Sequence, residues 1–98
     1  MTIVNARKKP VVIQAVQWTG DNLQEILEFV GRHPDFDNWF QDNAEYADFV
    51  RNDGNRFKIK TLEGTMYADA GDWVIRGVKG EFYPCKPDVF AETYEVVP

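Results

Sequence analysis

TMYADAGDWVIRGVKGEFYPCKP, residues Thr65–Pro87, is the stretch that decides the fold of this chain. It contains two short apolar runs, which are separated by Gly77-Val78-Lys79-Gly80, a turn with a glycine at each end. Apolar runs joined by such a turn are typical of a β-hairpin. We therefore predict that Trp73–Arg76 and Glu81–Tyr83 pair at the centre of a small sheet, and that Pro84 ends the pairing because it has no N–H.

Segments on both sides of this hairpin predict further strands. Val11–Trp18 is rich in β-branched and aromatic residues, which favours a central strand buried on most of both faces. Tyr46–Arg51 and Arg56–Leu62 flank Asn52-Asp53-Gly54-Asn55, and Asp-Gly between two such runs indicates a second hairpin. Shorter strands are expected at Thr65–Ala68 and, as a closing strand, at Glu95-Val96-Val97.

One long helix is predicted before the hairpins. Apolar residues at i, i+3, i+4 and i+7 (Leu23, Ile26, Leu27 and Val30) form one stripe. Asn22 and Glu25 have the spacing of a capping box, and Gly31 stands where a C-terminal cap belongs. We expect a helix over about residues 22–30, packed on the sheet.

Two other segments have weaker helical signals. Residues 32–45 contain Phe36, Trp39 and Phe40 at helical spacing, and they suit either a short second helix or a loop that covers the edge of the core. Lys86-Pro87-Asp88 is expected to start a last helical turn, because proline is favoured at an early helical position.

These segments together predict a single α+β domain over residues 1–98, with residues 1–9 as a flexible arm. A chain of 98 residues supports one compact core, and its 44% hydrophobic and 28% charged content is that of a folded protein. We expect an antiparallel meander sheet or partly closed barrel of about five to six strands, with one main helix packed on it.

Several chemistries are excluded or disfavoured by the residue inventory. The chain has no serine, which excludes a serine hydrolase, and the single Cys85 allows neither an internal disulfide nor a cysteine-based zinc cage. Cys85 with His33 is the only Cys/His pair, and a lone cysteine is more often a small buried residue. We therefore expect no catalytic residue, no metal and no cofactor.

The acidic and basic residues indicate which classes of partner the chain is expected to bind. A net charge of −5 disfavours nucleic acid, so Arg56, Lys58 and Lys60 are interpreted as the solvent face of a strand. The acidic residues around the middle of the chain suit a solvated face or, alternatively, a surface for a basic protein groove. They are Asp35, Asp37, Asp42, Glu45, Asp48 and Asp53.

No apolar run approaches the roughly 18 residues of a membrane span, and the N-terminus lacks the order of a signal peptide. We therefore expect no membrane association and a cytoplasmic location.

The central hairpin is the best candidate for a binding surface, because aromatic and arginine side chains favour protein interfaces. Asp72 and Trp73 also have a structural interpretation, in which Asp72 bonds its own turn and Trp73 anchors the core. The predicted binding residues are Asp72, Trp73, Arg76, Lys79, Tyr83, Cys85 and Lys86.

Three stretches of the chain resemble a known type of protein: GDWVIRGVKGEFYPCKPDVFAETYE, the preceding TLEGTMYADA, and the early KPVVIQAVQWTGDN. They are similar to a small protein that recurs in phages and bacterial prophages. The resemblance covers most of the chain and is weakest over residues 32–55. A looser similarity links the turn Ala70-Gly71-Asp72-Trp73-Val74 to domains with a Pro-Gly-Asp-Tyr-Gly motif, although here Ala, Trp and Val replace Pro, Tyr and the last Gly. The resemblance implies the cytoplasm of an infected bacterium and supplies no catalytic residues.

We therefore expect a non-enzymatic phage or prophage accessory protein that binds another protein of host or phage. Exposed strand edges would also permit a homodimer. The alternatives are a small-molecule or nucleotide-binding domain with a pocket between helix and sheet and weak enzymatic activity, and a structural part of the virion.

Overall fold

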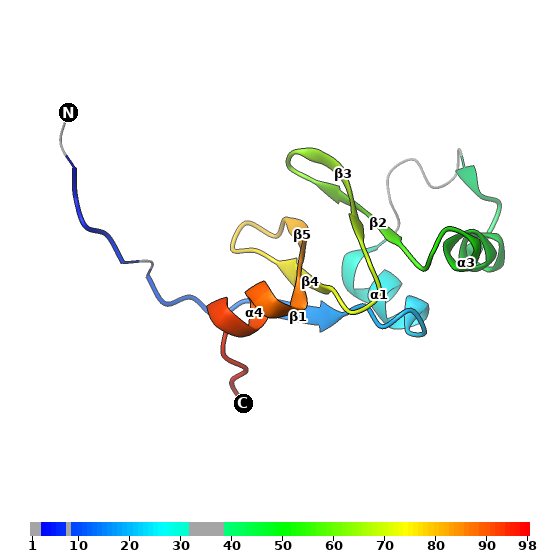
Figure 1. Cartoon of the computed structure of the whole chain (residues 1–98). Helices are drawn as coiled ribbons and strands as arrows, with labels where there is room; N and C mark the ends of the chain where they lie inside the picture. The colour runs from blue at the N-terminus through cyan, green and yellow to red at the C-terminus, as the bar shows by residue number, and fades with distance from the viewer. Residues whose placement is uncertain (1–2, 8, 32–38) are drawn as a thin grey trace.

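The computed structural model describes residues 3–7, 9–31 and 39–98. Its described helices and antiparallel strands confirm an α+β fold (Figure 1). The elements are β1 (Gln14–Gln17), α1 (Leu23–Val30), α3 (Asn43–Asn52), β2 (Phe57–Thr61), β3 (Gly64–Ala68), β4 (Trp73–Arg76), β5 (Phe82–Cys85) and α4 (Pro87–Thr93).

The strands are divided between two sheets. β1, β4 and β5 form an antiparallel sheet in the order β1-β4-β5, and β2 and β3 form an antiparallel hairpin. Because β3 and β4 are not paired, the described strands form neither one continuous meander nor a closed barrel. The predicted strands at Arg56–Leu62, Thr65–Ala68 and the central hairpin are confirmed as β2, β3 and β4–β5.

The prediction for Val11–Trp18 is wrong in two respects. The strand starts only at Gln14, and β4 rather than β1 is the central strand of its sheet. Val11 and Val12 are 50% and 80% exposed, so the apolar run does not correspond to a doubly buried strand. Composition favours a strand here, but only the pairing decides which strand is central.

Pro84 does not end the pairing of the hairpin. Val74 lies opposite Pro84, and Trp73 lies opposite Cys85. Gly77 N–H donates to the carbonyl of Glu81, so the alternation of an antiparallel ladder makes Val74 and Pro84 a pair without hydrogen bonds. An N–H at position 84 would point away from β4, toward the outer edge of the sheet. Proline is tolerated there on an edge strand, because no ladder hydrogen bond is lost.

Tyr46–Arg51 is not a strand but part of α3, which corrects the predicted second hairpin. The helix starts where the carboxylate of Asp42 accepts a hydrogen bond from the N–H of Glu45, at 2.9 Å. Tyr46 and Val50, four residues apart, are buried, so the apolar residues follow the helical period. Asp-Gly ends the helix here instead of joining two strands.

Residues 43–45 of the ambiguous segment belong to α3, whereas Phe36 lies outside the described residues. The ring of Phe40 packs 4.8 Å from that of Tyr46.

α4 confirms the predicted last helical turn. The closing strand at Glu95-Val96-Val97 is wrong, since these residues have no regular structure and Val96 is 81% exposed.

α1 confirms the predicted helix, but its start differs in detail from a capping box. Asn22 makes no side-chain cap; its amide donates to the carboxylate of Glu25 and its side-chain oxygen accepts from the N–H of Thr19. Gly31 ends the helix with φ of 83°, a conformation that favours glycine. Ile26 is fully buried against the sheets.

The three-stranded sheet is covered on both faces. Val74 belongs to the main core with Trp18, Ile26, Phe57 and Ile59. Ile75 follows Val74 on β4, so it points to the opposite face, where α4 packs through Phe90. Both residues are fully buried, so β4 lies between two apolar layers.

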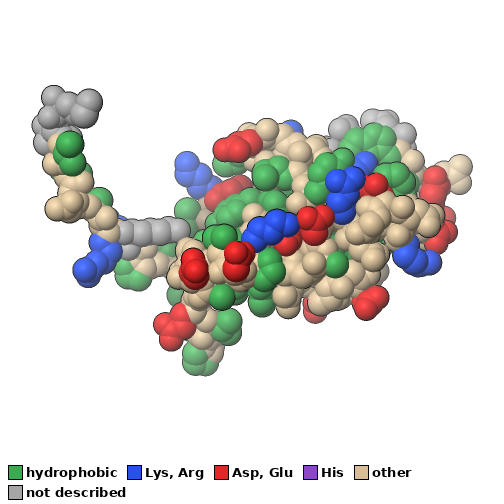
Figure 2. Space-filling model, viewed as in Figure 1, with side chains coloured by type: hydrophobic (Ala, Val, Ile, Leu, Met, Phe, Trp, Pro, Cys, Tyr) green, Lys and Arg blue, Asp and Glu red, His purple; other side chains and the backbone are tan. Residues whose placement is uncertain are grey.

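Residues 3–7 stand clear of this body (Figures 1 and 2), whereas residues 9–13 border hollows beside α4. The described residues 3–7 and 9–12 are exposed and have no regular structure. No helix among the described residues has the length and apolar character needed to span a membrane.

Candidate functional site

The turn between β3 and β4 holds the one carboxylate among the predicted binding residues, that of Asp72, and it is buried. Asp72 is 3% exposed, and its Oδ2 accepts a hydrogen bond from the N–H of Asp69 at 2.9 Å. The N–H of Gly71 donates to the carbonyl of Trp18, and the N–H of Trp18 donates to the carbonyl of Asp72. These bonds join the turn to the end of β1.

Lys86, which follows the last residue of β5 and so lies at the same end of the hairpin, neutralises this turn. Its Nζ lies 2.9 Å from Oδ2 of Asp69 and 3.0 Å from Oδ2 of Asp72. Hydrogen bonds to these two carboxylates, that of Asp69 first, raise the pKa of Lys86 above its ordinary value. Asp72 and Lys86 are therefore brought together as an ion pair that fastens the start of α4 to the start of β4.

Trp73 contributes to the layer under α4. Its ring stacks on that of Phe90 with centroids 4.2 Å apart and planes 8° apart, and the next ring along, Tyr94, is 5.2 Å from Phe90. The hydroxyls of Tyr83 and Tyr94 are 3.3 Å apart. Burial, and secondly the bond to Tyr94, raise the pKa of Tyr83. The Tyr83 hydroxyl therefore favours its neutral form.

Cys85 lies on the same face as Trp73 and Tyr83 and is half-buried. Its Sγ donates a weak hydrogen bond to the carbonyl of Lys86 at 3.6 Å. Burial and the nearby negative charge of Asp72 raise the pKa of the thiol, which disfavours a reactive thiolate. His33, its only conceivable catalytic partner, lies outside the described residues.

Arg76 and Lys79 lie at the opposite end of the hairpin and are exposed. The turn between them is held by the N–H of Gly77, which donates to the carbonyl of Glu81, and by the N–H of Lys79, which donates to the carboxylate of Glu81. Among the described residues, neither the Arg76 nor the Lys79 side chain has an ion-pair partner. The predicted binding residues thus divide between two ends of the hairpin.

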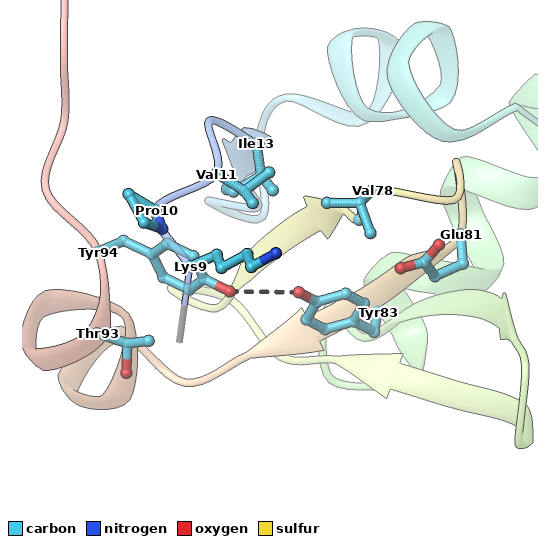
Figure 3. Close-up of a pocket in the computed structure, with 10 residues that line it drawn as sticks. Lys9, Pro10, Val11, Ile13, Val78, Glu81, Tyr83, Thr93 and Tyr94 are labelled. Atoms are coloured by element: carbon cyan, nitrogen blue, oxygen red, sulfur yellow. Dashed lines mark hydrogen bonds between the residues drawn. The ribbon is translucent and has the colours of Figure 1, made fainter. Parts of the chain in front are cut away.

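A hollow of about 510 Å³ lies between the hairpin turn, the segment before β1 and α4 (Figure 3). The hydroxyls of Tyr83 and Tyr94 and the amino group of Lys9 are its main polar groups, together with Glu81. Its apolar lining consists of Pro10, Val11, Ile13 and Val78. Of the predicted binding residues, only Tyr83 lines it.

A second hollow of about 540 Å³ adjoins the first and shares five of its residues, namely Pro10, Val11, Ile13, Thr93 and Tyr94. Ala15, Trp73 and Phe90 continue its lining, and the C-terminal Val96 and Val97 border it. The two hollows form one largely apolar depression on both sides of Tyr94. We call it the Tyr94 groove.

Sequence reasoning missed Lys9, Val11, Ile13 and Tyr94 as members of a site. The segment before β1 is polar and basic around residue 9, which is typical of a solvated arm. Phe90 and Tyr94 at i, i+4 were the available signal, because this spacing places both rings on one face of a helix. What that face covers depends on how α4 folds back on the sheet.

Metal binding has no support in the described part of the chain, where no group of three or more His, Cys, Asp or Glu residues is placed to hold an ion. The Tyr94 groove instead combines apolar walls with the hydroxyls of Tyr83 and Tyr94, the amino group of Lys9 and the carboxylate of Glu81. Such a surface can take an apolar side chain and a nearby anionic group.

Comparison with protein-family models found no match, and neither the curated proteins nor the solved structures contain one.

Proposed function

We propose that this chain is a non-enzymatic binding module that holds a segment of another protein in the Tyr94 groove. The observation that carries the proposal is an open apolar groove bordered by exposed apolar residues and by cations without partners. Exposed apolar patches of this kind mark interaction sites. Val11, Val12, Val78, Val96 and Val97 are each at least half exposed around it.

The charges near the groove indicate the chemistry of the partner. Lys9 lines the groove and Lys79 lies in the adjoining turn, whereas Arg76, which follows Ile75 on β4, points to the opposite face of the sheet. These cations have no ion-pair partner among the described residues, although the whole chain carries a net charge of −5. We infer that the partner segment has an apolar anchor with acidic residues beside it, since complementary charges direct association.

Except for Lys60, the other cations of the described body already have partners. Arg51 pairs with Asp48, Arg56 with Asp53, and Lys86 with Asp69 and Asp72. Lys58 lies over the rings of Trp39 and Phe49. Lys60 is exposed and unpaired on β2, and it serves as a control because it does not line the groove.

The resemblance to phage and prophage proteins suggests where the partner is found. We propose that the chain acts in the cytoplasm of the host bacterium and that its partner is a protein of the phage or of that host. No step of this proposal requires the chain to change a covalent bond.

A small anionic ligand is a second candidate for the same groove. The amino group of Lys9 and the hydroxyls of Tyr83 and Tyr94 face one hollow, whose volume of about 510 Å³ suits a small molecule. Against it, the carboxylate of Glu81 lines the same hollow and would repel an anion.

The proposal is tested by capturing partners from bacterial lysate with the tagged chain and then measuring the affinity of the purified partner. We expect Val78→Asp and the double reversal Lys9→Glu with Lys79→Glu to weaken binding at least about tenfold. Lys60→Glu, the matched reversal outside the groove, should leave the affinity unchanged.

Increasing salt should weaken the wild-type complex and not the residual binding of the double reversal. Equal affinity of the wild type and the groove variants would overturn the proposal. A captured species that proves to be a small molecule would instead favour the second candidate.

A further inference from the structure

We propose that residues 95–98, the segment that follows α4, close over the Tyr94 groove and compete with the partner segment for it. We call these residues the strap. The inference rests on the proposed function, because it adds the regulation of that same site. The strap already borders the groove, since all of its residues line the second hollow together with Pro10, Val11 and Ile13.

The strap has the chemistry that we infer for the partner segment. Glu95, an acid, stands directly before the apolar pair Val96 and Val97. The two valines are 81% and 54% exposed, so the strap leaves apolar surface uncovered beside a largely apolar groove. Burying that surface in the groove removes it from water, which favours the closed form.

The strap begins in extended backbone. Tyr94 ends α4 with φ of −122° and ψ of 150°. In an extended segment successive side chains point to opposite sides, so Glu95 and Val97 share one side and Val96 points to the other. Val97 is also the less exposed of the two valines. Glu95 and Val97 are therefore the side chains that face the groove in the closed form.

Lys9 supplies the charge opposite to that of the strap. Its side chain lines the first hollow and extends across it beside Tyr94 (Figure 3). Tyr94 directly precedes Glu95 and lines both hollows, so Lys9 and Glu95 belong to adjoining parts of one groove. Both side chains are exposed, and neither has an ion-pair partner among the described residues. Closure brings the two charges together.

The start of the strap is anchored, so a weak contact is sufficient for closure. The ring of Tyr94 stacks on that of Phe90 with centroids 5.2 Å apart, and its hydroxyl lies 3.3 Å from that of Tyr83. A segment on so short a tether has an effective concentration on the order of millimolar at its site. If the strap is closed about nine-tenths of the time, the apparent affinity for the partner falls about tenfold, because only the open groove binds it.

Nuclear magnetic resonance of the purified full chain tests the closure without any partner. We expect nuclear Overhauser contacts between the methyl groups of Val97 and Val11, and order parameters in the strap above the value of about 0.6 that separates flexible backbone. Glu95→Lys places two cations together and should abolish both the contacts and the order. The exchange Lys9→Glu with Glu95→Lys should restore them.

Glu92→Lys is the matched control for the charge reversal. Glu92 is exposed on α4 and lines neither hollow, so this variant should keep the contacts and the order of the wild type. A wild-type strap that shows neither contacts nor order would overturn the inference. Contacts that survive Glu95→Lys unchanged would overturn it as well.

The affinity of the captured partner tests the competition. Val96→Ser with Val97→Ser removes the apolar contacts of the strap without a change of charge, and it should raise the affinity about tenfold. If the strap were part of the wall that holds the partner, this variant would lower the affinity, and the inference would fail. If the strap closes but no captured protein depends on Val78 and Lys79, the proposed function fails, whereas the closure of the groove by the strap stands.

Discussion

Lys86 Nζ lies 3.0 Å from Oδ2 of Asp72, a residue that is only 3% exposed. This contact joins two turns that lie 14 residues apart in the chain and close the same end of the β4–β5 hairpin. A buried carboxylate is costly unless it is hydrogen-bonded and paired, and Asp72 has both kinds of partner. The contact therefore stabilises the fold at the end of the hairpin that is farther from the free cations Arg76 and Lys79.

Asp72→Ala should lower the free energy of unfolding by about 2 kcal/mol, because it leaves the Asp69 N–H and the Lys86 ammonium without their shared acceptor. Urea unfolding at neutral pH measures this loss. Asp69→Ala is the matched control: that side chain is 54% exposed and should cost clearly less. Equal losses for the two variants would contradict the importance of the buried carboxylate.

Stability should fall as the pH rises above about 10. The pKa of Lys86 is raised above its ordinary 10.5, and that of Tyr83 above its ordinary 10.0. A group whose pKa is raised by folding contributes its full stability below the ordinary value and loses it as the pH rises through the folded value. Urea midpoints between pH 8 and pH 12 measure the effect.

The variant Tyr83→Phe should show a smaller alkaline loss than the wild type, since it removes one of the groups whose pKa is raised by folding. Thr65→Val, a change at an exposed position of β3, is the control and should keep the wild-type pH profile. A urea midpoint that stays constant up to pH 12 would be inconsistent with these pKa shifts.

Phe90→Ala should destabilise the chain by about 3 kcal/mol, because Phe90 is 7% exposed and fills the space between Trp73 and Tyr94. Thermal unfolding followed by circular dichroism measures the loss. Val89→Ala on the same helix is 49% exposed and should change stability by no more than about 0.5 kcal/mol. A comparable effect of the two changes would mean that α4 is not anchored through its aromatic face.

Gly77→Ala should destabilise the chain by about 1 kcal/mol, because the added Cβ would collide with the carboxylate of Glu81, which must then release the N–H of Lys79. In a Glu81→Ala background the same change should cost less, since the colliding group is gone. A double-mutant cycle on urea unfolding measures this coupling. Strict additivity of the two changes would argue against the contact.

Local patterns were sufficient for several elements. The apolar stripe from Leu23 to Val30 predicted α1, and the glycine-bracketed turn at residues 77–80 predicted the β4–β5 hairpin. β2 followed from the alternation of Phe57 and Ile59 with lysines. In each case the sequence pattern lies within one element or one short turn, and the hydrogen bonds that form that element or turn are local too. The sequence was therefore enough to predict these elements.

Other features depended on contacts between distant segments. Tyr46–Arg51 became helix instead of strand because the Asp42 cap and the burial of Tyr46 and Val50 outweighed an Asp-Gly turn signal. The same turn signal is compatible with either outcome. Whether an apolar run such as Val11–Trp18 is central or at the edge depends on its pairing with β4, much later in the chain, where Gln14 lies opposite Arg76 and Gln17 opposite Trp73.

The sequence by itself determined the position of the central hairpin, and its lack of serine and its single cysteine exclude a serine nucleophile and an internal disulfide. Only the tertiary structure divided the predicted binding residues: it pairs Asp72 with Lys86 and leaves Arg76 and Lys79 without an ion-pair partner among the residues that it describes. It also assembled the Tyr94 groove from three segments that are remote in the chain. The physical reason is that residue types and spacing specify local conformation, whereas burial and charge pairing arise only when distant segments meet.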